Sequence, residues 1–144
     1  MKIKVLFVCI HNSARSQMAE AFLNHHASEI FQAQSAGLEP GKLNPLVVLA
    51  MSQMEIDLSQ NTTNSVFDFL KEGRTYNYVI TVCDESNSER CPIFPAVNER
   101  LHWNFKDPSA INGTKADKFK KTIEIRDEIY SKINEFVQKI KSEI

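Results

Sequence analysis

The sequence lacks long apolar runs and an excess of charge of either sign. No stretch approaches the roughly 18 consecutive apolar residues of a membrane-spanning helix. The chain has 17 Lys and Arg residues against 18 Asp and Glu, a formal net charge of −1. Its longest basic cluster, residues 115–121, also contains Asp117 and is typical of a solvated helix face. The composition argues against a membrane span, and against nucleic acid as the main partner, because phosphate-backbone binding needs clustered Lys and Arg.

Cysteine is scarce and odd in number, with three residues among 144. A chain of this length buries roughly two thirds of its unfolded surface, so it needs neither a disulfide framework nor a structural metal. No repeat, low-complexity segment or linker divides it, and its first residues begin a strand pattern without a signal-peptide profile. We expect one domain over residues 1–144, located in the cytoplasm. Reduced cysteines there have redox, catalytic, metal-binding or merely buried roles.

Two apolar, β-branched runs lead to cysteines. Residues 2–9 alternate and then become fully apolar, the pattern of a strand covered on both faces, and they end at Cys9. Residues 78–82 form the second run, which leads directly to Cys83. Weaker strand patterns cover residues 31–36, stopped by Gly37, and residues 100–105.

Helical patterns separate the strands. They cover residues 13–27, 45–54 and 66–72 and the segment after residue 114. Asn12 or Ser13 is a plausible cap of the first helix, and Thr114 with Asp117 resembles a capping box at the start of the last. The last helix carries an apolar stripe that we interpret as core: Phe119, Ile123, Ile129, Ile133, Phe136, Val137 and Ile140. Strands that alternate with helices predict an α/β fold with a parallel sheet, where ligands bind beyond the strand carboxyl ends.

The loop after the first predicted strand contains the residue types of an oxyanion-binding site. It contains Cys9, Ile10, His11, Asn12, Ser13, Ala14 and Arg15. A tight turn into a helix directs backbone N–H groups inward as an anion cradle, and Arg15 adds a planar fork of donors. The same positive field favours Cys9 as a nucleophile. Ser16 either donates a hydroxyl to the sulfur or is a plain first-turn serine, and we expect His11 to point outward.

Asp107 precedes Pro108 just beyond the fourth predicted strand. A general acid must reach the oxyanion from a loop, and an Asp-Pro turn at this edge would hold a carboxyl there stiffly. An aspartate that merely initiates a turn is the alternative.

Cys83 and Cys91 lie eight residues apart, which does not suit a zinc site. A thiol relay fits better. If the intervening segment is helical, eight residues rise ~12 Å, whereas a disulfide needs Cα atoms ~4.4–6.8 Å apart. Oxidation of this pair would then require a change of conformation.

These motifs resemble the low-molecular-weight tyrosine phosphatase superfamily, and in particular its thioredoxin-coupled arsenate reductase branch. The matching segments are residues 8–9, 12–13, 15–22, 82–83, 91–92, 94–95 and 102–108. The resemblance implies a single-domain three-layer sandwich, in which helices cover both faces of a four-stranded parallel sheet.

The resemblance also implies roles for individual residues. Cys9 would be the nucleophile, Arg15 the oxyanion clamp, Ser16 the thiolate donor and Asp107 the general acid. Cys83 would attack Cys9 to release arsenite, and Cys91 would then attack Cys83, leaving a Cys83–Cys91 disulfide for thioredoxin to reduce. The oxyanion would bind to the loop residues from Ile10 to Arg15. We expect a monomer without a tightly bound cofactor.

Two other functions remain open. A phosphomonoester hydrolase would use Cys9, Arg15 and Asp107 through a phosphocysteine. Phosphatases of this superfamily usually carry aromatic residues after the aspartate, whereas here Pro108 is followed by Ser109 and Ala110. A non-enzymatic oxyanion-binding or redox-sensing module is the third reading. Ala14 is a further departure, because some arsenate reductases of this branch have a second cysteine directly before the loop arginine.

The resemblance extends in part to a potassium site found in some members. Asn12, Glu20 and Ser35 match three of its positions. The fourth, a carboxylate expected near Asn64 and Ser65, is missing. The resemblance therefore implies at most a weak potassium site and no other metal.

Overall fold

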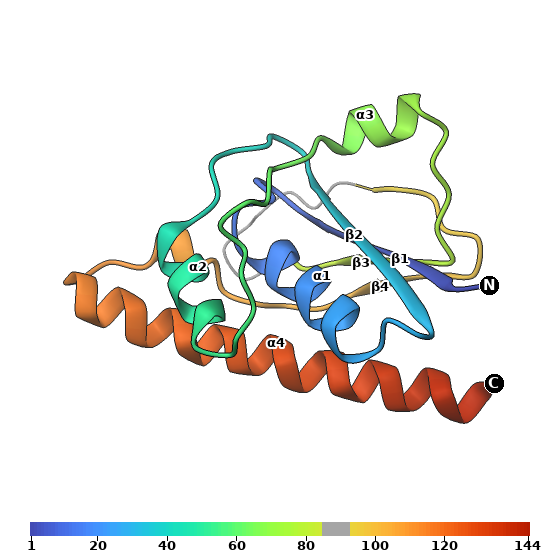
Figure 1. Ribbon diagram of the computed structural model, residues 1–144. Helices are drawn as coiled ribbons and strands as arrows, with labels where there is room; N and C mark the ends of the chain where they lie inside the picture. Colours follow the sequence, from blue (N-terminus) through green and yellow to red (C-terminus); the bar gives the residue numbers. More distant parts are fainter. Residues whose placement is uncertain (85–92) are drawn as a thin grey trace.

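The described residues, 1–84 and 93–144 of the computed structural model, contain a four-stranded parallel sheet in the order β2-β1-β3-β4 (Figure 1). Its strands are β1 (Ile3–Cys9), β2 (Phe31–Gly37), β3 (Tyr78–Thr81) and β4 (Glu99–His102). β1 is central, and Val5 through Cys9 are all buried, as their apolar run predicts. The last strand ends at His102, earlier than predicted.

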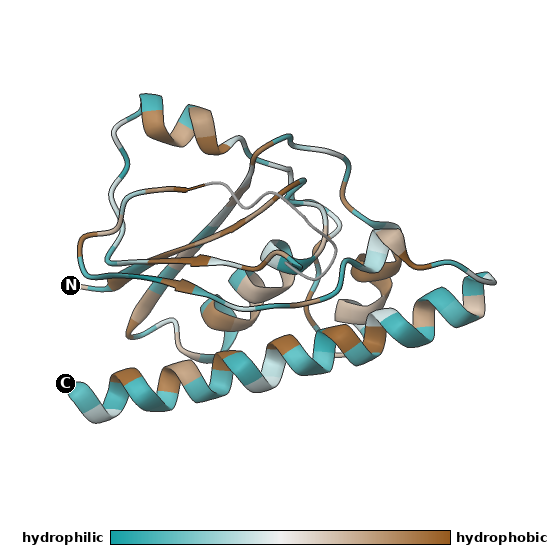
Figure 2. Ribbon diagram, turned by 180° about the vertical axis from the view of Figure 1, so that it is seen from behind, coloured by the Kyte–Doolittle hydropathy of each residue, from teal (hydrophilic) through white to brown (hydrophobic). Residues whose placement is uncertain are grey.

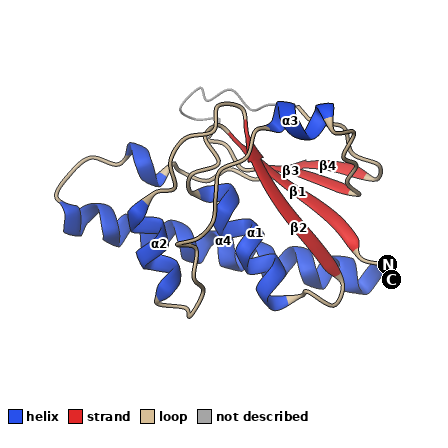
Figure 3. Ribbon diagram, turned by 45° about the horizontal axis from the view of Figure 1, so that its top comes forward, coloured by secondary structure: helices blue, strands red, loops and turns tan. Residues whose placement is uncertain are grey.

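Helices cover both faces of the sheet. They are α1 (Arg15–His26), α2 (Pro45–Ser52), α3 (Val66–Lys71), the 3₁₀ turn η2 (Pro108–Ala110) and α4 (Lys115–Glu143). α1, α2 and α4 lie on one side of the sheet and α3 on the other (Figures 1 and 3). Phe7 of β1 belongs to the core on the α1 and α4 side, whereas Leu6 packs in the smaller core beneath α3. The predicted three-layer α/β fold is confirmed.

The last helix starts as predicted and buries most of the predicted stripe, namely Ile129, Ile133, Phe136, Val137 and Ile140. The Thr114 hydroxyl accepts from the Asp117 N–H at 3.1 Å, and the Asp117 carboxylate accepts from the Thr114 N–H at 3.3 Å. Figure 2 shows apolar positions recurring along α4. At its start the buried side chains are Thr122, Ile125 and Arg126, whereas the predicted Phe119 and Ile123 are only partly buried. Polar residues occupy core positions here because their hydrogen bonds are satisfied: Thr122 bonds Lys118 O within the helix, and Arg126 bonds Ala50 O of α2.

The predicted cap of the first helix is wrong. α1 begins at Arg15, its N-cap is Ala14, and no side chain caps it. Asn12 has a φ of 54° and turns its side chain to Ser16 and Asn64 instead. The first N–H groups of α1 therefore face the loop without competition from a capping side chain.

α2 ends at Ser52, before the predicted Met54. The chain reverses there, because Ile56 N–H bonds Met51 O and Glu55 has a φ of 61°. The polar segment leading to Cys91, including that cysteine, lies outside the described residues. Among the helices that the structure describes, none is both long and apolar enough to span a bilayer.

Candidate active site

Residues 9–14 form a loop. Each backbone carbonyl of this loop accepts a hydrogen bond from a residue outside the loop. We call residues 38–44 the collar, because its N–H groups bind four of these carbonyls. The pairs are Leu38 N to Cys9 O at 3.1 Å, Glu39 N to Ile10 O at 2.8 Å, Gly41 N to His11 O at 2.9 Å and Asn44 N to Ser13 O at 3.0 Å. Gln17 Nε2 binds Asn12 O at 3.1 Å, and Met18 N binds Ala14 O at 3.0 Å. Because the C=O and N–H of one peptide unit point in opposite directions, the N–H groups of the loop are turned inward.

Cys9 lies at the centre of this loop, with 2% of its surface exposed. Its Sγ accepts from the Asn12 N–H at 3.0 Å and lies 2.9 Å from Ser16 Oγ. Asn12 Nδ2 donates to the same Ser16 Oγ at 2.7 Å, which leaves the serine proton to point at the sulfur. The site thus offers Cys9 two donors, the arrangement that suits a thiolate.

Arg15 and Asp107 flank the loop. Arg15 is 3% exposed, and its Nη1 donates to Phe105 O at 3.0 Å. Its Nη2 lies 3.8 Å from Asp107 Oδ2, while Asp107 Oδ1 accepts from the Ser109 N–H at 2.9 Å. One carboxyl oxygen therefore initiates the η2 turn, whereas the other faces Arg15, and the role of general acid stays a prediction.

Cys83 lies just beyond the carboxyl end of β3, the strand next to β1. Val8 of β1 pairs with Thr81 of β3, and Val82 N–H bonds Val8 O at 2.9 Å, which places Cys83 just beyond. Cys83 is fully buried and shares a hydrophobic cluster with Cys9, and both residues are thiols. The structure thus brings Ser16 against the Cys9 sulfur and Asp107 next to Arg15, and it places Cys83 at the same end of the sheet as Cys9. Cys91 lies outside the described residues.

His11 is exposed, and its Nδ1 lies 3.0 Å from Glu39 O of the collar. The ring is therefore directed away from the sulfur, as expected from the sequence.

Sequence reasoning missed a set of polar residues that holds the loop from behind. Gln17, 1% exposed, donates from Nε2 to Asn12 O and to Thr62 O, both at 3.1 Å. Asn61 Nδ2 donates to Gln17 Oε1 at 3.1 Å, and Asn64 N–H donates to Asn12 Oδ1 at 2.8 Å. The one feature of the sequence that could have indicated this set is Gln17, a polar residue among the buried residues of the first turn of α1.

The residues matching the potassium site are hydrogen-bonded to other protein groups. Asn12 Oδ1 accepts from the Asn64 N–H, and Ser35 O accepts from Asn64 Nδ2 at 3.1 Å. Ser35 Oγ donates to Glu20 Oε1 at 3.2 Å. Two oxygens of the matching residues thus already accept amide N–H groups, and burial raises the pKa of Glu20 to about 7. Across residues 1–84 and 93–144, no three His, Cys, Asp or Glu side chains gather as metal ligands.

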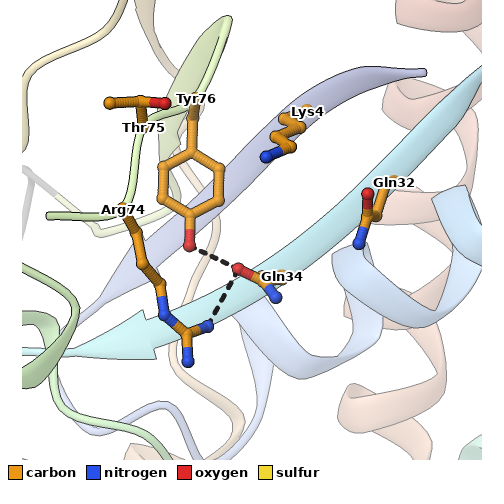
Figure 4. A pocket seen from close by; sticks show the side chains of 6 residues that line it. All are labelled: Lys4, Gln32, Gln34, Arg74, Thr75 and Tyr76. Atoms are coloured by element: carbon orange, nitrogen blue, oxygen red, sulfur yellow. Dashed lines mark hydrogen bonds between the residues drawn. The ribbon is translucent and has the colours of Figure 1, made fainter. Parts of the chain in front are cut away.

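A second polar pocket, of about 320 Å³, lies near the start of β1 (Figure 4). Its lining residues are Lys4, Gln32, Gln34, Arg74, Thr75 and Tyr76. Tyr76 Oη and Arg74 Nη1 both donate to Gln34 Oε1, and Arg74 Nε pairs with Glu72 at 2.6 Å. Since these groups bind one another and the lining holds no thiol, we place the chemistry at the Cys9 loop.

Comparison with known proteins agrees with this geometry. A sequence profile of the low molecular weight phosphotyrosine protein phosphatase family matches residues 4–144. An arsenate reductase of Shouchella clausii (strain KSM-K16) is 38% identical over 135 residues, which cover 93% of this chain and 94% of that relative. The solved structure of an arsenate reductase in the phosphate binding state has a TM-score of 0.74 at 28% identity, covering 97% of this chain and 99% of that chain. A thioredoxin-dependent arsenate reductase of Corynebacterium glutamicum has a TM-score of 0.71 at 28% identity, covering 99% of this chain and 63% of that chain.

Proposed function

Because the chain belongs to the low molecular weight phosphotyrosine protein phosphatase family, we propose that it is an arsenate reductase working through a thiol–disulfide relay. The observation that carries the proposal is the second buried thiol. Cys83 lies just beyond the carboxyl end of β3, the strand paired with β1, which ends at Cys9, and both thiols belong to the same hydrophobic cluster. A hydrolase of this kind needs one thiol, whereas reduction by two electrons needs two.

The first step is attack on arsenate. The oxyanion binds to the inward N–H groups of the loop and to the Arg15 guanidinium, which together hold it against the Cys9 sulfur. A Cys9 S–As bond forms, and the hydroxyl group of the arsenate leaves as water after it takes one proton from Asp107. Asp107 Oδ2 carries that proton, because Oδ1 is bound to the Ser109 N–H. Arsenic remains pentavalent in this step.

The second step is the reduction. The Cys83 thiolate attacks the Cys9 sulfur, the S–As bond breaks, and its electron pair goes to arsenic, which leaves as arsenite. A Cys9–Cys83 disulfide remains, so two thiols have been oxidised and arsenic has gained two electrons. The Cys91 thiolate then attacks Cys83, restores the Cys9 thiolate and leaves a Cys83–Cys91 disulfide.

An external dithiol must reduce that last disulfide. We propose thioredoxin, a choice supported by the structural similarity to a thioredoxin-dependent arsenate reductase. The proposal includes a monomer in the cytoplasm, where thioredoxin is kept reduced. It involves no tightly bound cofactor, and no step needs potassium.

The test is arsenate-dependent consumption of NADPH in the presence of thioredoxin and its reductase. We expect turnover by the wild-type protein and none by Cys9→Ser or Cys83→Ser. After one turnover without thioredoxin, mass spectrometry should find a Cys83–Cys91 bridge. Undiminished turnover by Cys83→Ser would contradict the relay.

Phosphomonoester hydrolysis is the competing function, because the same Cys9, Arg15 and Asp107 could form and hydrolyse a phosphocysteine. Arsenate reduction is favoured because Ser109, with its small polar side chain, stands two residues after Asp107, where an aromatic wall would bind a phenyl group. Turnover of para-nitrophenyl phosphate far above the rate of arsenate reduction would reverse this preference.

A further inference from the structure

Asn44 is hydrogen-bonded to three separate parts of the molecule. Its backbone N–H donates to Ser13 O of the Cys9 loop at 3.0 Å. Its side-chain Oδ1 accepts from Leu46 N–H at 2.9 Å and caps α2. Its Nδ2 donates to Ser109 Oγ at 2.9 Å, a contact between residues 65 positions apart. One residue therefore ties the oxyanion loop to the segment that carries Asp107.

Asp107 lies midway between two anchors, each two residues away. On one side Phe105 O accepts from Arg15 Nη1 at 3.0 Å. On the other side the Ser109 hydroxyl is held by Asn44, and the Ser109 N–H holds Asp107 Oδ1 at 2.9 Å. η2 spans only residues 108–110 and has little stability of its own. Loss of the Asn44 contact would leave the carboxyl tethered from one side.

We propose that the Asn44–Ser109 bridge is a positioning device, which holds the Asp107 carboxyl over the oxyanion bound at Cys9. The inference rests on the proposed function, because it concerns the acid in that reaction. A carboxyl displaced by about 1 Å transfers its proton much less efficiently, whereas the cradle that binds the oxyanion is unaffected. The bridge should therefore influence the rate of the chemical step more than substrate affinity.

Two variants remove the bridge with little other change. Ser109→Ala deletes the exposed hydroxyl but keeps the N–H that binds Asp107. Asn44→Ser keeps both the N–H to Ser13 and a good helix cap, but cannot reach Ser109. Ser52→Ala is the control, since it removes another exposed serine hydroxyl, which among the described residues binds Leu49 O at the far end of α2.

The rate of thiol loss at saturating arsenate in a single turnover measures the step directly. We expect about a tenfold decrease in either bridge variant, with the arsenate concentration for half-maximal rate changed less than about twofold. The double variant should be no slower than either single one, because both remove the same contact. The ¹⁵N order parameters of Asp107, Ser109 and Ala110 should fall from about 0.85 in both variants, and not in Ser52→Ala.

Wild-type rates with unchanged order parameters in Ser109→Ala would overturn the proposal. So would strictly multiplicative effects of the two substitutions, because Asn44 and Ser109 would then act separately. If the wild-type protein itself lost no thiols with arsenate, the proposed function would fail. The order parameters would in that case still decide whether the bridge holds the Asp107 loop.

Discussion

At the scale of single residues, Gly37 shows how closely the Cys9 loop packs on β2. A Cβ atom at Gly37 would lie 2.8 Å from both Asn12 N and Ile10 O, which are backbone atoms of the loop. Gly37→Ala should therefore distort the cradle, lower arsenate reduction at least about tenfold and destabilise the fold by about 1–3 kcal/mol. Gly41→Ala is the matched control, because a Cβ there meets only His11 Cβ at 3.6 Å. Urea unfolding and single-turnover rates measure both effects, and equal behaviour of the two variants would refute close packing as the cause.

Glu20 makes stability depend on pH. Burial raises the pKa of Glu20 from 4.5 to about 7 in the folded chain. Between these values the folded form keeps a proton that the unfolded form has lost, so the contribution of Glu20 to stability is greatest below pH 4.5 and is lost as pH rises through about 7. At about 1.4 kcal/mol per pH unit, the loss amounts to about 3 kcal/mol. Glu20→Gln keeps an acceptor for Ser35 Oγ but cannot ionise.

Urea unfolding at pH 5 and pH 8 separates this contribution from that of other groups. The wild-type protein should lose about 2–3 kcal/mol more than Glu20→Gln over this range. The same difference should be found in KCl and in NaCl, because amide donors occupy the neighbouring oxygens. A difference present in NaCl but absent in KCl would show that potassium binds Glu20 after all.

The residues of the site differ in how far the sequence could reveal them. Cys9, Arg15 and Ser16 are close in sequence, so one strand-to-helix loop was enough to predict that they meet. Gln17 and Asn64 could not be assigned, because their contacts to Thr62 and Asn12 join positions 45 and 52 apart. Such pairings depend on how the polar segment before α3 folds back, and no local pattern determines that.

At the scale of helices, Arg126 connects α4 to the end of α2. Its Nη1 donates to Ala50 O at 2.9 Å and to Gln53 Oε1 at 3.1 Å. The Ala50 carbonyl belongs to the last turn of α2, where the helix dipole also favours a cation such as the Arg126 guanidinium. Arg126→Ala should cost about 2–3 kcal/mol in the free energy of unfolding, because it leaves that carbonyl without its charged donor.

Lys121 on the same helix is the control. Its pairing with Glu124 at 3.4 Å is exposed, so Lys121→Ala should cost less than about 0.5 kcal/mol. Chemical denaturation of both variants checks the contrast, which would fail if the two costs were alike. Sequence periodicity located α4 but not this role, since an arginine among apolar positions is ordinarily assigned to the solvent side.

The ends of the helices also show that sequence patterns predict local contacts but not tertiary ones. The Thr114–Asp117 capping box was predictable because both bonds lie within four residues. The Asn12 or Ser13 cap was wrong, because Asn12 is held by Ser16 and Asn64 and so shapes the cradle instead. Local propensity thus fails at the site itself, where tertiary contacts determine the backbone.

At the scale of the whole molecule, the parallel α/β fold and the family resemblance followed from the sequence and are confirmed. The collar was not predictable, although it binds four carbonyls of the Cys9 loop. Its contribution is made by backbone N–H groups, which leave no trace in residue type. For the proposed function, the collar also explains how a chain with a net charge of −1 would hold an anion, because the positive field of the inward N–H groups is local.

A local field predicts how phosphate, as an arsenate mimic, should bind. At about 100 times its dissociation constant, phosphate should stabilise the folded protein by about 2.7 kcal/mol, raising the melting temperature by about 2–4 °C per kcal/mol. Cys9→Ser should keep this shift because its backbone cradle is intact. Arg15→Lys should lose most of it, since the guanidinium fork is removed.

Salt separates this mode of binding from nonspecific attraction to surface lysines. The buried cradle is screened weakly, so the dissociation constant should rise less than about threefold between 50 and 200 mM NaCl. Proteins that hold polyanions through many exposed cations lose about 10³–10⁵ in affinity over that range. A steep salt dependence, or a full thermal shift in Arg15→Lys, would place the phosphate outside the Cys9 loop, because neither result is compatible with a donor set of inward N–H groups and one buried arginine.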